Sequence, residues 1–166
     1  MGRVWAFVTI AFLAGLGTGL LVQRTTLAPP RQSDIRTADP AIQKLHKADE
    51  ECTLTQDPVC LTALWSDDGI NLGFPGPPVV GKKAIGEAYA KFREQNPEFK
   101  VLKYLPHYKN TQIAVVDEWA IEVGSADATF KISASAAPVD APRTKGMRLL
   151  KRQSDGSWKF ALVGMK

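Results

Sequence analysis

Glu122 and Arg148 are the two residues whose types and expected positions best suit chemistry at an enclosed site. Alternating apolar and polar residues over 113–124 predict a strand on which Glu122 lies opposite Trp119. Arg148 falls on a later predicted strand of the same sheet. An inward Glu–Arg pair can bind a polar ligand, or the arginine can set the pKa of an acid–base glutamate. A structural ion pair inside the fold is the simpler interpretation.

Aromatic residues supply candidates for the wall of an apolar pocket. Trp65, Tyr89 and Trp119 fall on three different predicted elements that could converge. With Glu122 and Arg148 they form the predicted ligand-binding set, although core packing explains each aromatic residue more simply.

Metal or nucleophilic chemistry finds little support in the sequence. His46 and Asp49 have i, i+3 spacing on the first predicted helix, where Asp49 interrupts the apolar stripe. The pair could ligate a metal or relay a proton, but two ligands do not make a metal site. The chain has no Ser/His/Asp set, phosphate loop or Cys/His cluster with usable spacing. We therefore expect no metal and no cofactor.

Cys52 and Cys60 are the only cysteines in the chain. Their spacing fits neither a zinc site nor a redox CxxC motif. In an oxidising compartment they could form a disulfide across the turn at Asp57-Pro58. Two buried free thiols are an equally good interpretation.

The order of predicted elements indicates an α+β domain. Helices are predicted from Asp39-Pro40, over 59–65 and over 82–95, with Asp–Pro pairs marking the first two starts. Strands are predicted over 70–74, 99–108, 113–124 and 128–136, followed by a loop at 138–142 and a hairpin over 145–163. Helices followed by an antiparallel meander place the helices on one face of a curved sheet.

The N-terminal sequence predicts a membrane anchor. Val4 to Val22 carries no charge and as a helix would be about 28 Å long, close to the hydrocarbon thickness of a bilayer. We divide the chain into residues 1–24, a signal anchor or signal peptide, a polar linker over 25–38, and a domain over 39–166. The domain is expected on the extracytoplasmic (periplasmic) side, or secreted if the N-terminal segment is cleaved.

The charge distribution argues against nucleic-acid binding. The chain has a net charge of +4, but residues 1–38 hold four arginines and one aspartate. The predicted domain is therefore nearly neutral and has no basic patch of the kind that binds nucleic acid.

Several short motifs, taken together, resemble the SnoaL-like (nuclear transport factor 2-like) superfamily, and most closely its domain-of-unknown-function 4440 group. They span roughly residues 40 to 163. The motifs are Asp57, Leu64-Trp65-Ser66-Asp67-Asp68, Pro75-Gly76-Pro77-Pro78, Gly81-Lys82-Lys83-Ala84-Ile85, Asp117 to Gly124 and Lys151 to Lys159.

The resemblance implies a cone-shaped, curved antiparallel sheet with three N-terminal helices on its concave face, an open pocket and a homodimer formed through the sheet. It does not imply one activity. Ketosteroid isomerases of this fold need a carboxylate base just before a proline on the strand after the Asp-Asp segment. Here Gly73 and Phe74 precede Pro75, and neither accepts a proton. The ketosteroid isomerase mechanism, which needs a carboxylate base at this position, is therefore excluded.

Two hypotheses remain. The first is an exported or membrane-tethered cone domain that binds a small apolar or amphipathic ligand, or only a second copy of itself. The second is an isomerase, cyclase or hydrolase that uses Glu122 as its acid–base group beside Arg148. The missing base at Gly73 and Phe74 favours the first.

Overall fold

The computed structural model describes residues 31–34, 39–106 and 112–165, which form one curved sheet and three helices. The helices are α1 (Pro40–Thr55), α2 (Pro58–Ala63) and α3 (Lys82–Gln95). The strands are β1 (Arg31–Asp34), β2 (Trp65–Asn71), β3 (Val79–Val80), β4 (Lys100–Pro106), β5 (Gln112–Val116), β6 (Trp119–Lys131), β7 (Val139–Arg152) and β8 (Trp158–Met165).

The strands form an eight-stranded open sheet in the order β1-β5-β6-β7-β8-β2-β3, with β4 paired to β6 off this path. The long strand β6 pairs with β5 through its first half and with β4 through its second half. All pairings are antiparallel except that of β2 with β8, which is parallel. The predicted α+β class is confirmed, whereas the purely antiparallel sheet is wrong because β2 enters after two helices rather than through a hairpin.

Two aspartates fix the helix starts that the sequence predicts. The Asp39 carboxylate accepts a hydrogen bond from the Ala41 amide, and the Asp57 carboxylate accepts one from the Val59 amide. Each caps a helix whose first residue is a proline. The first helix ends at Gln56, which adopts a left-handed conformation with φ of 55°. This sharp end lets α2 fold back beside the last turn of α1.

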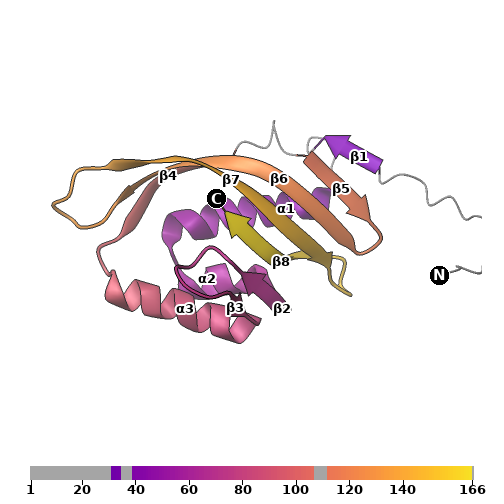
Figure 1. Ribbon diagram of the computed structural model, residues 1–166, viewed down its shortest axis with the longest axis horizontal. Helices are drawn as coiled ribbons and strands as arrows, with labels where there is room; N and C mark the ends of the chain where they lie inside the picture. The colour runs from indigo at the N-terminus through magenta and orange to yellow at the C-terminus, as the bar shows by residue number, and fades with distance from the viewer. Residues whose placement is uncertain (1–30, 35–38, 107–111, 166) are drawn as a thin grey trace, which may run out of the picture.

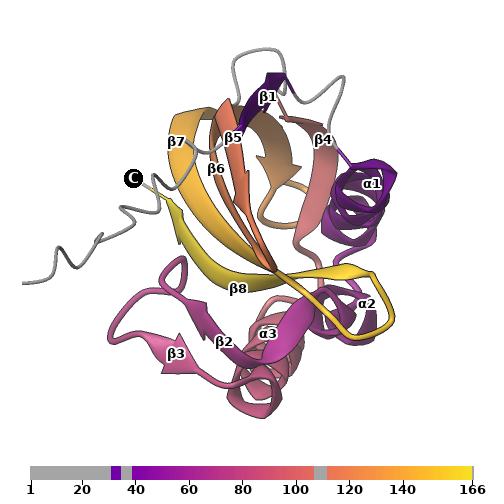
Figure 2. The ribbon, with the colours of Figure 1, turned by 90° about the vertical axis from the view of Figure 1, so that its right-hand side faces the viewer.

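Helix α1 lies under the arch formed by β4, β6 and β7, as Figure 1 shows, and α2 and α3 lie together beside β2 (Figure 2). Ile42 and Leu45 of α1 are buried, as are Ala120 of β6 and Leu150 of β7, which are paired across the sheet. Gly86 permits the close approach of α2 and α3, because a Cβ there would lie 2.9 Å from the Thr62 hydroxyl. The core therefore fills the space between α1 and the inner face of the sheet.

The predicted strand over 113–124 is two strands, and the prediction of its faces is partly wrong. Asp117, with φ of 52°, and Glu118 form a two-residue turn between β5 and β6. The reversal pairs Ile113 with Glu122, so these two side chains share the buried face. On a single strand over 113–124, alternation would place Ile121 on the same face as Ile113, but Ile121 is exposed on the outer face.

Other boundaries also differ from the predicted ones. The second helix is shorter and β2 starts at Trp65, before the predicted strand over 70–74. Strand β6 runs on to Lys131, and β7 begins at Val139 inside the predicted loop over 138–142. Residues 31–34 of the predicted linker form β1, which pairs with β5. Backbone pairing with neighbouring strands, which no local pattern shows, sets these limits.

The predicted membrane segment Val4–Val22 lies outside the described residues. Within the described ranges, no helix is both long enough and apolar enough to cross a bilayer.

Candidate functional site

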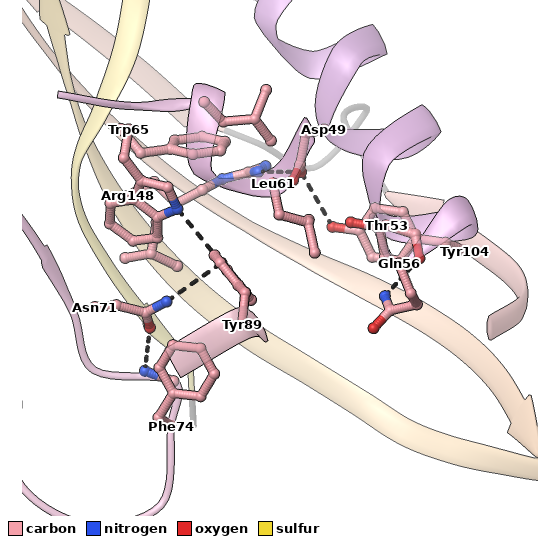
Figure 3. Close-up of a pocket in the computed structure, with 14 residues that line it drawn as sticks. Asp49, Thr53, Gln56, Leu61, Trp65, Asn71, Phe74, Tyr89, Tyr104 and Arg148 are labelled. Carbon is pink, nitrogen blue, oxygen red and sulfur yellow. Dashed lines mark hydrogen bonds and ion pairs between the residues drawn. The ribbon is translucent and has the colours of Figure 1, made fainter. Parts of the chain in front are cut away.

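A cavity of about 240 Å³ lies between α1, the α2–β2 corner, α3 and the strands β4, β7 and β8. Figure 3 shows side chains from these elements pointing towards one another around it. The lining residues are Asp49, Thr53, Gln56, Leu61, Leu64, Trp65, Asn71, Gly73, Phe74, Tyr89, Tyr104, Arg148, Phe160 and Val163.

One wall of the cavity is charged. The Arg148 guanidinium on β7 donates through Nη1 to Oδ2 of Asp49 on α1 at 2.9 Å. The Tyr104 hydroxyl on β4 donates to the same carboxylate oxygen at 3.4 Å. The three side chains thus join α1, β4 and β7 at a single buried carboxylate that faces the cavity (Figure 3).

Glu122 and His46 lie behind this wall and do not line the cavity. Arg148 Nη2 lies 3.2 Å from Glu122 Oε1, and His46 Nε2 lies 2.9 Å from the same oxygen. Glu122 is only 1% exposed, and its Oε2 atom has no hydrogen-bond partner within the part of the chain that the structure describes. Arg148 therefore bridges two carboxylates, one facing the cavity and one enclosed.

The two carboxylates have opposite electrostatic environments. Burial raises the pKa of Asp49 above its ordinary value, and the Arg148 guanidinium only partly offsets this. Burial would also raise the pKa of Glu122, but contacts with His46 and Arg148 outweigh burial and hold the pKa below its ordinary value. Asp49 is thus the carboxylate closer to taking up a proton, whereas Glu122 stays ionised to lower pH and is the anion that holds Arg148.

The opposite wall is polar but uncharged. The Trp65 indole N–H and the Asn71 amide N–H each donate to the Tyr89 hydroxyl at 3.4 Å. The Gly73 amide donates to the Asn71 side-chain oxygen at 2.7 Å. Burial, as the main cause, raises the pKa of Tyr89 to about 12, so its phenol stays protonated at neutral pH.

Apolar side chains separate the two polar walls. Leu61, Leu64 and Val163 are buried along the cavity, and the Arg148 guanidinium lies 5.4 Å from the centre of the Phe160 ring. Phe74 packs edge-on against Tyr89 with ring centres 5.1 Å apart. The cavity therefore suits a compact ligand with an apolar body.

The structure brings together three of the five residues in the predicted ligand-binding set. Trp65, Tyr89 and Arg148 line the cavity. Glu122 lies behind Arg148, and Trp119 lies on the outer face of β6, where the Lys151 ammonium is 5.3 Å from its ring centre. The prediction of Trp119 as a pocket residue is not supported by this placement, because alternation along β6 directs Ala120 and Glu122 inward instead.

Sequence reasoning assigned no ligand-binding role to Asp49, Tyr104 or Asn71. Asp49 could have been found from its place as a charged residue within the apolar stripe of α1. It is the residue of that stripe whose carboxylate faces the cavity. Tyr104 carries no comparable signal, because aromatic residues are common on strands. Asn71 carries none either, because a single asparagine next to a predicted turn is explained by turn chemistry. Gly73 and Phe74, at the position where an isomerase base is expected, do line the cavity. The carboxylate that faces it comes instead from α1.

Cys52 of α1 and Cys60 of α2 are joined by a disulfide, with Cα atoms 5.4 Å apart. The bond holds the corner between two pairs of cavity residues. Thr53 lies in α1 and Gln56 directly after it, and Leu61 lies in α2 and Leu64 directly after it. Across residues 31–34, 39–106 and 112–165, no group of three or more His, Cys, Asp or Glu side chains is arranged to hold a metal ion.

Comparison with solved structures shows the fold. The chain is similar to a ketosteroid isomerase-like protein of Erwinia carotovora atroseptica, with 22% identity over 76% of this chain and 92% of that one and a TM-score of 0.62. It is also similar to ActVI-ORFA of Streptomyces coelicolor, with 12% identity, 76% and 94% coverage and a TM-score of 0.63. A third similar structure is a candidate dehydratase of the NTF2-like family from Streptomyces avermitilis. It has 13% identity over 76% of this chain and 93% of that one, with a TM-score of 0.62.

These similarities place the described domain in the NTF2-like, or SnoaL-like, fold class. No protein-family model matches the sequence, and comparison with curated proteins finds no match. The finer assignment to the domain-of-unknown-function 4440 group stays a prediction.

Proposed function

We propose that this domain binds one small, mainly apolar, electrically neutral ligand inside the cone. The observation that carries the proposal is the cavity of about 240 Å³ with Asp49, Arg148 and Tyr104 on one wall and Tyr89 on the other. An engineered apolar cavity of about 150 Å³ binds benzene. The volume here therefore suits a single substituted ring or a chain of similar size.

The charge balance of the site favours a neutral ligand over an anion. Arg148 is held between Asp49 and Glu122, so its positive charge is already compensated. A carboxylate or phosphate would meet Asp49 beside the only guanidinium among the lining residues. A hydroxyl or carbonyl group can instead exchange hydrogen bonds with these side chains without bringing a new charge into a buried site.

The test is a search for bound ligand, combined with variants that fill the cavity. Native mass spectrometry of the chain purified from its source cells reports any retained small molecule. The substitution Val163→Phe places a larger ring at the cavity wall and should abolish retention. Val139→Phe makes the same change at an exposed position of β7 and should leave retention unchanged. Equal retention by both variants, each folded, would contradict the proposal.

A second candidate function is proton-transfer catalysis with Asp49 as the acid–base group. It is favoured by one observation: Asp49 faces the cavity and burial raises its pKa, whereas the pKa of Glu122 is lowered and Glu122 is enclosed. The geometry thus favours Asp49 over Glu122, which acts by positioning Arg148. Isomerase, cyclase and hydrolase reactions all use such a group.

Exchange of the methyl protons of acetophenone in D2O tests this second function. The assay detects proton abstraction next to a carbonyl without knowledge of the natural substrate. If Asp49 is a base, the native protein accelerates exchange and Asp49→Asn loses a factor of about 10² or more. An accelerated rate that Asp49→Asn preserves would assign the chemistry to another group.

We also propose a homodimer formed through the outer face of the sheet. Ile121, Val123 and Met147 are 49%, 46% and 51% exposed, and Val123 and Met147 are direct cross-strand partners. An apolar strip on an outer face suits an isologous contact with a second copy. Val123→Glu should convert the dimer to a monomer in analytical ultracentrifugation, and Val59→Glu, an exposed change on α2, should not.

Export with membrane tethering through Val4–Val22 is proposed on separate grounds. The Cys52–Cys60 disulfide suits an oxidising compartment outside the cytoplasm. Fractionation of cells that express the full chain, followed by protease treatment of intact spheroplasts, tests this. Protection of a membrane-bound domain from the protease would contradict an extracytoplasmic location.

A further inference from the structure

The Tyr89 hydroxyl is surrounded by donors. It accepts one hydrogen bond from the Trp65 indole and one from the Asn71 amide, both at 3.4 Å (Figure 3). A phenol oxygen has two lone pairs, and these two donors occupy both of them. The Tyr89 hydroxyl can therefore still donate one hydrogen bond through its own proton.

The direction of both hydrogen bonds is fixed by chemistry. An indole nitrogen is a donor only, so Trp65 cannot accept from Tyr89. The amide of Asn71 could in principle be turned either way. However, the Gly73 backbone N–H lies 2.7 Å from the side-chain oxygen, and an N–H needs an acceptor. This contact fixes the oxygen towards Gly73 and the NH2 group towards Tyr89. Tyr89 is thus an acceptor in both bonds.

No acceptor for the Tyr89 proton is found among residues 31–34, 39–106 and 112–165. The ring lies on α3, and Phe74 covers one side of it. Tyr89 lines the cavity, so the cavity is the direction in which its O–H can donate. Two accepted hydrogen bonds also polarise the phenol and strengthen the bond that it donates.

We propose that Tyr89 donates a hydrogen bond to an oxygen atom of the ligand, so that the cavity selects a small compound with oxygen functions at both ends. One end carries a hydroxyl that donates to the Asp49 carboxylate beside Arg148. The other carries a carbonyl or another acceptor oxygen at Tyr89. A phenolic or hydroxylated cyclic ketone has this chemistry. The inference rests on the proposed ligand-binding function and specifies the class of ligand.

The experiment compares two probes that differ in one oxygen. 4-Hydroxyacetophenone has a hydroxyl and a carbonyl at opposite ends of one ring, whereas 4-ethylphenol replaces the carbonyl by a CH2 group of similar size. Binding of each to the full chain is measured by NMR titration, with native protein and with Tyr89→Phe. We expect Tyr89→Phe to lower the affinity for 4-hydroxyacetophenone roughly three- to tenfold, which is the effect of losing one neutral hydrogen bond. The affinity for 4-ethylphenol should not change.

A second measurement needs no substitution. The infrared carbonyl band of 4-hydroxyacetophenone bound to native protein should lie below its position in an apolar solvent, as expected for an accepted hydrogen bond. This measurement covers the case in which Tyr89→Phe, which leaves two buried donors without an acceptor, does not fold.

The outcomes separate the two claims. Binding of both probes with equal losses in Tyr89→Phe, or an unshifted carbonyl band, overturns the role of Tyr89 and leaves the ligand site standing. A band shift that persists in a folded Tyr89→Phe variant assigns the donor to another group and also overturns it. Failure of both probes to bind native protein contradicts the proposed ligand site, and the inference falls with it.

Discussion

Asp49 and Arg148 lie 99 residues apart in the chain, and their side chains meet at 2.9 Å. The contact joins the helix under the arch to the strand above it. Because Arg148 also reaches Glu122 at 3.2 Å, one guanidinium compensates two carboxylates in the interior. The charges that join α1 to the sheet are thus the same charges that give the cavity its polar wall.

Replacing Arg148 by methionine should therefore destabilise the domain strongly. The change keeps much of the side-chain volume but leaves Asp49 and Glu122 without their shared cation. Loss of one partner of a buried ion pair costs about 3–5 kcal/mol in the free energy of unfolding. Urea denaturation at pH 7 and pH 4 measures this. The loss should be smaller at pH 4, where protonation of the carboxylates relieves the uncompensated charge.

Arg143→Met is the matched control for this prediction. Arg143 contacts Asp127 at 2.8 Å, but its side chain is 55% exposed. Exposed ion pairs contribute little to stability, so this variant should unfold at nearly the native urea concentration. Similar losses in the two variants would show that the buried position of Arg148 is not what matters.

Glu122→Gln tests the enclosed carboxylate. The pKa of Glu122 is lowered in the folded protein, so its ionised form stabilises the fold above its ordinary pKa of 4.5. That contribution is lost as the pH falls through the lowered pKa. At pH 7 the variant should be less stable than the native protein by about 2 kcal/mol, as expected for a hydrogen bond to a charged group. The difference should shrink below pH 4.5, and a constant difference from pH 7 to pH 3 would contradict the assignment.

The sequence predicts the fold class well because the fold depends on local signals. The helix caps at Asp39 and Asp57 and the hairpin turn before Trp158 can each be predicted from a few neighbouring residues. The turn at Asp117 contains neither glycine nor proline, and it was missed. That single omission reversed the inferred faces of β5 relative to β6, because a strand alternates with period two.

The site is predicted less completely because its residues come from elements that only the tertiary fold brings together. The sequence predicts Arg148 as a partner of Glu122, and the structure contains this contact. The second partner, Asp49, was visible only as an irregularity in an apolar stripe. Which of the two carboxylates faces the cavity depends on the packing of α1 against β4 and β7. No spacing in the sequence encodes that choice.

Asp49→Asn should change the pH dependence of stability in the direction opposite to Glu122→Gln. The pKa of Asp49 is raised above its ordinary value of 3.8. Its contribution to stability is therefore greatest below that value and is lost as the pH rises through the raised pKa. Relative to the native protein, Asp49→Asn should become more stable between pH 3 and pH 7. Parallel slopes for the two variants would show that the carboxylates share one environment.

The Cys52–Cys60 disulfide should stabilise both the fold and the cavity wall. It closes a loop with a sequence separation of 8, for which chain entropy gives roughly 2–3 kcal/mol. Thermal unfolding of a Cys52→Ala, Cys60→Ala double variant should show a corresponding loss. The bond also holds Gln56 and Leu61 at the corner that lines the cavity. Affinity for 4-hydroxyacetophenone should therefore fall at temperatures where the variant is still fully folded. Unchanged affinity there would show that packing alone positions this wall and that the disulfide acts only on global stability.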